Sequence, residues 1–158
     1  MDMDEGTFQR PDWDEYFFDI AKVVASRSAC FRNKVGAVIV RDKKIVSTGY
    51  NGAPKYQKNC REIGFCFRDK NHIKSGSSLE SCRAVGSHAE SNAICLAAKH
   101  GTSCENGTMY VYGHVDICVQ CRAMIANSGI TRAMIKRPSG KILKYDVTKW
   151  TNHPIDMN

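Results

Sequence analysis

The sequence predicts an α/β fold, a three-layer αβα sandwich with a central mixed sheet, formed by a single domain over residues 1–158. Three observations carry this prediction. Helix-like and strand-like segments alternate along the chain, as they do in layered α/β domains. Residues 35–40 read VGAVIV, which is the β-branched composition of a buried strand. With 158 residues, 42% of them hydrophobic, the chain is long enough to bury one core.

The first third of the chain is expected to form a helix and a hairpin. Residues 1–11 are acidic and polar and read as a loose arm. Residues 12–29 read as an amphipathic helix that Asp12 caps, because apolar side chains recur at helical spacing: Trp13, Phe17, Ile20 and Val24. Strands are expected over residues 35–40 and 45–50, joined by a turn at 42–44 and followed by a loop at 50–54.

The remainder of the chain is expected to continue the alternation after an insert. Residues 55–86 show no periodicity. A helix is predicted over residues 87–100, because Ser87 and Glu90 form a capping-box pattern and Gly101 follows. A strand at 108–112, a helix at 119–128, a strand at 130–136, a turn at 138–140 and a short helix near 145–150 complete the order.

The charge distribution favours a phosphate-bearing partner. The formal net charge is +7, and residues 31–74 hold eleven Lys/Arg against three Asp/Glu. A basic face of this kind fits a nucleotide or a nucleic acid, and it equally fits a solvated surface without a ligand. No segment approaches the roughly 20 apolar residues of a membrane span, so no membrane partner is expected. The acidic N-terminus does not have the form of a secretory signal, and a cytoplasmic protein is expected.

Two predicted helix starts carry residues suited to metal chemistry. His88 stands at the first, and Cys118 and Cys121 stand at the second as a C-x-x-C pair. One imidazole and two thiolates make three zinc ligands, which leaves a fourth position open, as in catalytic zinc sites. Glu90 follows His88 by two residues and can move protons without being a ligand. C-x-x-C alone also fits half of a structural zinc site or a redox pair, but the combination is specific.

These motifs resemble the cytidine deaminase superfamily, and within it the deoxycytidylate (dCMP) deaminases. The H-x-E…C-x-x-C order is that of the zinc nucleobase deaminases. The similar segments lie at residues 34–41, 47–54, 88–94, 108–111 and 118–121, and S-T-G-Y-N-G-A-P at 47–54 is typical of dCMP deaminases. One departure is Ile117, which stands where the family pattern has proline before the first cysteine.

The resemblance implies a cytidine-deaminase-like fold and a set of site residues. His88, Cys118 and Cys121 would hold the catalytic zinc, and Glu90 would be the proton shuttle. Asn51 would bind the sugar hydroxyl, and the backbone at Ala89 would bind the pyrimidine carbonyl. Two further candidates from the residues themselves are Tyr50 for the base and Lys55 for the phosphate; their alternatives are core packing and a solvated charge.

The activity that the resemblance implies is hydrolytic deamination of dCMP to dUMP and ammonia, which supplies dUMP for thymidylate synthesis. The enzyme would be a hydrolase acting on a cyclic amidine C–N bond. The resemblance also implies a hexamer, dCTP and dTTP as effectors, and Mg with a dCTP effector. Three alternatives stay open: a deaminase of dCTP or another cytosine nucleotide, a nucleic-acid-acting cytosine or adenosine deaminase, and a zinc protein without catalysis.

The eight cysteines suggest a second metal site. Some bacterial and phage dCMP deaminases carry a structural zinc near the insert, and Cys30 and Cys60 match positions used there. Cys66 and Cys82 would complete a Cys₄ set, with His72 as an alternative ligand. Such a site would tether residues 55–86, which otherwise lack a hydrophobic pattern. The alternative is four free thiols.

Overall fold

The structure is a computed structural model that describes residues 9–150. The expected arm at 1–11 therefore lies largely outside the described residues, and residues 9–11 are exposed coil. The elements in order are α1 (Trp13–Ala25), β1 (Gly36–Arg41), β2 (Lys44–Tyr50), α2 (Cys60–Ile63), α3 (Phe67–Lys70), a 3₁₀ turn (Leu79–Ser81), α4 (Ala89–Lys99), β3 (Thr108–Tyr112), α5 (Val119–Asn127), β4 (Arg132–Lys136), β5 (Ile142–Asp146) and a second 3₁₀ turn (Val147–Lys149).

Within the part of the chain that the structure describes, five strands form one mixed sheet in the order β2-β1-β3-β4-β5. In this sheet β3 and β4 pair in parallel, with Met109 opposite Ala133, and the other three pairs are antiparallel. The parallel pair is connected through α5, as a parallel connection requires a crossover. The predicted mixed sheet is confirmed.

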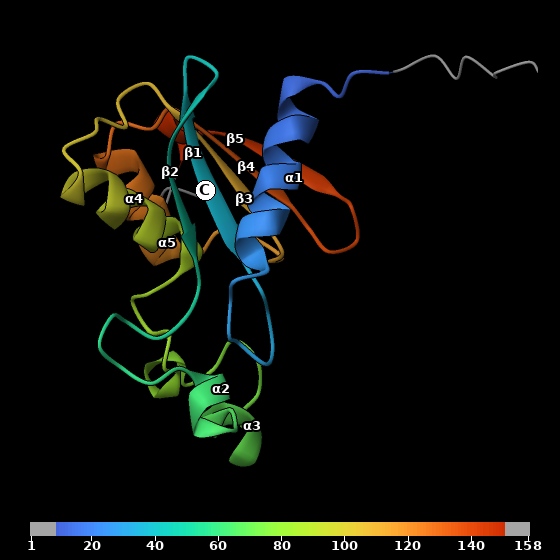
Figure 1. Ribbon diagram of the computed structural model, residues 1–158, viewed down its shortest axis with the longest axis vertical. Coiled ribbons are helices and arrows are strands. Elements are labelled where there is room, and N and C mark those ends of the chain that lie inside the picture. The colour runs from blue at the N-terminus through green and yellow to red at the C-terminus, as the bar shows by residue number, and fades with distance from the viewer. Residues whose placement is uncertain (1–8, 151–158) are drawn as a thin grey trace, which may run out of the picture.

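Helices cover both faces of this sheet, so the predicted three layers are confirmed. Helix α1 lies on one face and α4 and α5 lie together on the other (Figure 1). Strand β1 is buried on both sides: Val38 and Val40 pack under α1, and Ala37 and Ile39 pack under α4 and α5. Alternate side chains of a strand point to opposite faces, which explains why VGAVIV shows no polar alternation.

The local signals at the start of the chain have the expected structural effect. The Asp12 carboxylate accepts a hydrogen bond of 2.8 Å from the backbone N–H of Glu15 and caps α1. The β1–β2 hairpin turns through Asp42 and Lys43, whose φ angles of 51° and 60° are both positive. Two successive positive φ angles define the type I′ turn that matches the twist of paired strands.

The helix at the His88 motif begins differently from the prediction. The capping box from Ser87 to Glu90 was wrong: the N-cap is His88, with φ −77° and ψ 164° and no side-chain cap. The Ser87 hydroxyl instead lies 3.2 Å from the amide oxygen of Asn92. The backbone of His88 is extended, and its imidazole makes no capping hydrogen bond to the helix. The imidazole is therefore available to side chains outside the helix.

The short helix expected near residues 145–150 is confirmed only as a 3₁₀ turn at Val147–Lys149, because a strand occupies the residues before it. Strand β5 occupies residues 142–146, paired antiparallel to β4 with Leu143 opposite Ile135, and a single 3₁₀ turn follows. Without β5, strand β4 would be an edge with unpaired N–H and C=O groups. The hydrogen bonds to that edge outweigh the weak local helix preference of the tail.

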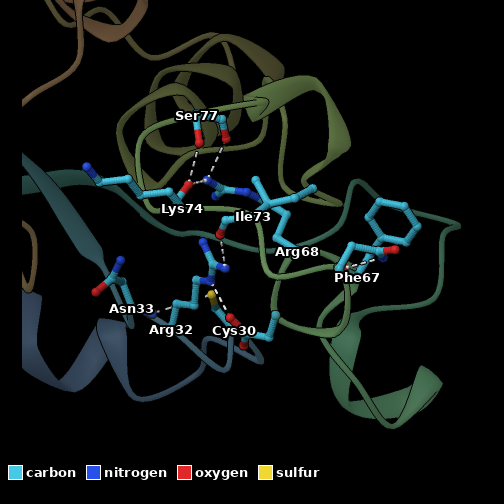
Figure 2. A network of polar contacts seen from close by, with 10 residues as sticks. Cys30, Arg32, Asn33, Phe67, Arg68, Ile73, Lys74 and Ser77 are labelled. Atoms are coloured by element: carbon cyan, nitrogen blue, oxygen red, sulfur yellow. Dashed lines mark hydrogen bonds and ion pairs between the residues drawn. The ribbon is translucent and has the colours of Figure 1, made fainter.

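The insert between β2 and α4 forms a separate lobe at one end of the sheet, and arginines hold its loops together (Figures 1 and 2). Arg32 binds the Asp69 carboxylate and the carbonyl of Ile73, each at 2.6 Å. Arg68 is only 7% exposed and donates to the carbonyls of Lys74 and Ser77 at 3.1 and 2.8 Å. Side-chain hydrogen bonds to backbone carbonyls therefore order a segment that has little hydrophobic core.

No helix within the described span of residues 9–150 combines the length and apolar character needed to cross a bilayer.

Candidate active site

Three potential metal ligands from two helix ends converge. The sulfurs of Cys118 and Cys121 each lie 3.5 Å from Nδ1 of His88. Among residues 9–150, His88, Cys118 and Cys121 are the group of potential ligands whose donor atoms all lie within 4.8 Å of one another. The structure thus brings together residues 30 positions apart, as the order of helix and strand between them predicted.

The position of each ligand follows from the local chain. Cys118 is the N-cap of α5 and Cys121 lies in its first turn, so both sulfurs sit where the N–H groups and dipole of the helix favour thiolates. His88 occupies the same position at the start of α4. Because α4 and α5 pack side by side on one face of the sheet, their N-terminal ends meet.

The three groups alter one another's protonation. Hydrogen bonds with Cys121 and with His88 lower the pKa of Cys118 to about 4. The hydrogen bond with Cys118, together with burial, raises the pKa of Cys121. The hydrogen bond to Cys118 also raises the pKa of His88.

The donor set fits zinc. Imidazole nitrogen and thiolate sulfur are the ligands that zinc prefers, and a tetrahedral site with bonds near 2.0 and 2.3 Å separates N from S by about 3.5 Å. The separations of 3.5 Å found for both sulfurs match this value. With three protein donors the site has the composition of a catalytic zinc centre, since one position stays open for water or substrate.

Glu90 lies beside this cluster in a position suited to proton transfer. It is in the first turn of α4, two residues after His88, and is only 5% exposed. Its burial raises the pKa of the carboxyl group. Glu90 lines the same cavity as His88 and Cys118.

That cavity has a volume of about 500 Å³, which is in the range of small-molecule sites. It runs from His88 and Glu90 toward the insert, and Asn51 and Ala89 line it. Ala89 is the first residue of α4, so its N–H has no partner within the helix. The Asn51 amide accepts from the N–H of Val35 and donates to the carbonyl of Asn33, both at 2.9 Å, which leaves one amide hydrogen for a ligand.

Two other predicted contact residues lie elsewhere. Tyr50 is 40% exposed and does not line the cavity; its carbonyl accepts a hydrogen bond of 2.8 Å from the Asn92 amide. Lys55 is exposed, and its ammonium lies 5.1 Å from the centre of the Tyr56 ring, also outside the cavity lining. The structure therefore joins Asn51, Ala89 and Glu90 into one site without these two side chains.

The four cysteines near the insert are gathered at the other end of the cavity. Cys30, Cys60, Cys66 and Cys82 all line it and all are free thiols. Burial raises the pKa of Cys60, and the neighbouring thiols of Cys66, Cys30 and Cys82 add to this effect. Within residues 9–150 these sulfurs do not converge as the His88 group does, and His72 is exposed outside the cavity.

Sequence reasoning missed two groups of residues around the cavity. Arg32, Arg68 and Arg83 supply positive charge at its insert end. Asp116, Arg122 and Tyr145 form a hydrogen-bonded network under the loop that leads to Cys118. Arg122 follows Cys118 by four residues and therefore lies on the same face of the helix. This spacing could have indicated its proximity to Cys118 from the sequence. Nothing in the sequence links Tyr145 to Asp116, because 29 residues separate them.

Comparison with known proteins agrees with this geometry. Residues 11–136 match the family described as "Cytidine and deoxycytidylate deaminase zinc-binding region". A deoxycytidylate deaminase of Mycobacterium phage D29 is 39% identical over 134 residues, which are 82% of this chain and 98% of that protein. The fission yeast (Schizosaccharomyces pombe) deoxycytidylate deaminase is 36% identical over 121 residues, or 77% of this chain and 36% of that protein. The chain thus spans only about a third of the yeast relative's length.

Solved structures show the same fold. The apo dCMP deaminase of cyanophage S-TIM5 superposes with a TM-score of 0.59 at 25% identity, covering 82% of this chain and 86% of that one. A cytidine deaminase from Burkholderia pseudomallei gives a TM-score of 0.60 at 17% identity over 88% of this chain and 94% of that one, which shows the fold alone. The chain belongs to the cytidine and deoxycytidylate deaminase family, and its similar relatives from phage and yeast are deoxycytidylate deaminases.

Proposed function

We propose that the protein deaminates dCMP with water to give dUMP and ammonia, and so supplies dUMP for thymidylate synthesis. The observation that carries the proposal is the convergence of His88, Cys118 and Cys121 beside the buried carboxyl group of Glu90 in one cavity. Support for dCMP as substrate comes from relatives of 34–39% identity that are deoxycytidylate deaminases. A cavity of about 500 Å³ is large enough for a nucleotide.

In this proposal His88, Cys118 and Cys121 hold zinc, which supplies a Lewis acid that activates water for attack on C4 of cytosine. Glu90 accepts a proton from the attacking water and delivers protons to N3 and to the departing amino group. The C4–O bond forms before the C4–N bond breaks, and of the two water protons one ends on N3 of dUMP and the other on the released ammonia. The N–H of Ala89 donates to the pyrimidine carbonyl, and the Asn51 amide binds the sugar hydroxyl.

The experiment that tests this function measures loss of cytosine absorbance with dCMP, dCTP and deoxycytidine side by side. The expected result is turnover of dCMP with kcat/KM well above the other two. Turnover confined to dCTP would keep the deaminase chemistry and reassign the substrate, with the loop at Ile117 as the place to look. Absence of turnover with all three, in protein that holds zinc, would contradict the proposal.

The arginines at the insert end of the cavity are proposed to bind the phosphate group. Arg83 donates from Nε to the carbonyl of Lys58 at 2.8 Å. No ion pair within the described residues involves Arg83, so its guanidinium is available to an anion, whereas Arg32 is paired with Asp69. A guanidinium bound to phosphate forms charge-assisted hydrogen bonds.

Replacing Arg83 by glutamine is expected to raise KM for dCMP about 10- to 100-fold, since a hydrogen bond to a charged group is worth about 1.5–3 kcal/mol. The kcat/KM for deoxycytidine, which lacks the phosphate, should change little. Lys55→Gln removes a positive charge outside the cavity and is the matched control. A larger effect of Lys55→Gln than of Arg83→Gln on the KM for dCMP would assign the phosphate to Lys55 instead.

Three finer features remain part of the proposal. A second, structural zinc on Cys30, Cys60, Cys66 and Cys82 requires their sulfurs to move closer together than they lie here. Two zinc ions per purified chain would support it, and one zinc ion per chain would argue against it.

The other two features are assembly as a hexamer and regulation by nucleotides. The mass of the protein in solution tests the hexamer. Adding dCTP with Mg, or dTTP, to the dCMP assay tests activation by the first and inhibition by the second.

A further inference from the structure

The residue before the first cysteine ligand is held at both of its backbone groups by side chains. The N–H of Ile117 donates to Oδ1 of Asp116 at 2.8 Å. The carbonyl of Ile117 accepts from Nε of Arg122 at 3.0 Å. Its own side chain is 2% exposed in the core beneath α5. The backbone that leads directly into Cys118 therefore has no freedom to rotate without breaking these contacts.

Asp116 is the centre of this arrangement. Besides the N–H of Ile117, its Oδ1 accepts a hydrogen bond of 2.7 Å from the hydroxyl of Tyr145, and its Oδ2 accepts one of 3.1 Å from Nη2 of Arg122. Three donors from three different places in the chain thus fix one carboxylate. Hydrogen bonds to both of its oxygens restrict the orientation of this carboxylate and of the N–H that it binds.

Arg122 joins the loop to the end of the described chain. Its guanidinium lies 5.3 Å from the ring centre of Tyr145 and 5.4 Å from that of Trp150, and the two rings are 5.5 Å apart. Arginine over aromatic rings gains cation–π attraction and also has little room to move. Side chains from strand β5 and from the residue after the second 3₁₀ turn therefore pack against the start of α5.

With proline in place of Ile117, the hydrogen bonds that hold the backbone at this position would be largely unnecessary. It has no N–H to satisfy and its ring fixes φ, so the loop of an H-x-E…P-C-x-x-C protein is restrained by covalent structure. Isoleucine at position 117, unlike proline, has a backbone N–H that needs an acceptor, and no ring fixes its φ. We propose that Asp116, Arg122 and Tyr145 are positioning residues that restrain Ile117 by hydrogen bonds, and so keep the sulfur of Cys118 in place beside His88.

This inference rests on the proposed function insofar as the cluster holds zinc, but its test does not depend on turnover. Outer residues that orient metal ligands typically change metal affinity 10- to 100-fold when they are replaced. The first readout is the rate at which zinc is released from the purified protein to a chromophoric chelator. Turnover of dCMP is measured in parallel.

Two tyrosines provide a matched pair of variants. Tyr145→Phe removes a hydrogen bond of 2.7 Å to Asp116, and Tyr110→Phe removes one of 2.8 Å to Asp14 on the other face of the sheet. Both lose one tyrosine–aspartate bond, so a merely structural effect is similar in both. Tyr145→Phe is expected to speed zinc release about tenfold, and Tyr110→Phe to leave it unchanged. Equal release rates in the two variants would overturn the proposal.

A rescue experiment separates positioning from general destabilisation. Asp116→Ala leaves the N–H of Ile117 without its acceptor and is expected to speed zinc release about 10- to 100-fold. Adding Ile117→Pro removes that N–H and fixes φ, so the double variant is expected to release zinc at least fivefold more slowly than Asp116→Ala. A double variant no slower than the single one would overturn the proposal.

The two proposals fail in different ways. Release rates that follow the expected pattern in a protein that does not turn over dCMP would contradict the proposed function alone. Normal turnover of dCMP with identical zinc release in all variants would contradict the positioning network alone.

Discussion

Replacing Glu90 by glutamine is expected to lower kcat for dCMP by about 10²- to 10⁴-fold, which is the usual contribution of a positioned general acid–base group. Glutamine has nearly the same shape but cannot accept and return a proton. Glu90 is 5% exposed and faces the cavity from the first turn of α4. Solvent therefore has poor access to take over the transfer.

The same variant should keep its zinc, because the convergent donor atoms belong to His88, Cys118 and Cys121. Zinc content, measured by metal analysis, and the thermal midpoint are expected to stay near those of the unmodified protein. Glu80→Gln is the control, since Glu80 is exposed in the insert. Turnover of the Glu90→Gln variant within a few-fold of the unmodified protein would show that another group moves the protons.

Replacing Gly49 by alanine is expected to displace helix α4, and with it the active-site residues at the start of that helix. A Cβ at this position of β2 would lie 2.3 Å from the carbonyl oxygen of Ala89 and 2.4 Å from the N of Ala93. Both are backbone atoms of α4, so the helix itself must move away from the sheet. Overpacking of this kind costs about 1–3 kcal/mol in free energy of unfolding.

The shift matters for function because Ala89 lies between His88 and Glu90. A displacement of about 1 Å in catalytic groups can cost about 10²-fold in rate, and a fall of this size in kcat is expected. Gly36→Ala is the matched control: its Cβ would lie 2.1 Å from the carbonyl oxygen of Ala21 in α1, on the opposite face. It should lower the thermal midpoint while leaving kcat of the folded enzyme nearly unchanged. Equal losses of kcat in both variants would contradict this reasoning.

The candidate metal-binding residues could be predicted from the sequence. Candidate zinc ligands are recognised by residue type and by their place at helix ends, so the sequence alone singles out His88, Cys118 and Cys121. The structure brings these three together, with Glu90 beside them. Most strands and helices were likewise predictable, because apolar periodicity at 12–29 and the buried run at 35–40 are local features.

Residues that reach the site from far along the chain were not predictable. Whether a charged or aromatic side chain lines the cavity depends on tertiary packing. Lys55 and Arg83 are equally plausible phosphate-binding residues when judged from the sequence, but of these two Arg83 lines the cavity and Lys55 does not. The tail is a similar case. Its residues became β5 because β4 offers an unpaired edge, a partner that local propensity does not register.

The sequence by itself therefore determined which atoms could bind zinc and which layered fold would present them, since residue chemistry and periodicity are properties of short segments. Only the tertiary structure decided how the Cys118 loop is restrained. The contacts of Asp116 with Tyr145 and of Arg122 with Trp150 join positions 29 and 28 residues apart. Such pairs exist only once β5 has paired with β4 and brought the end of the chain back over α5.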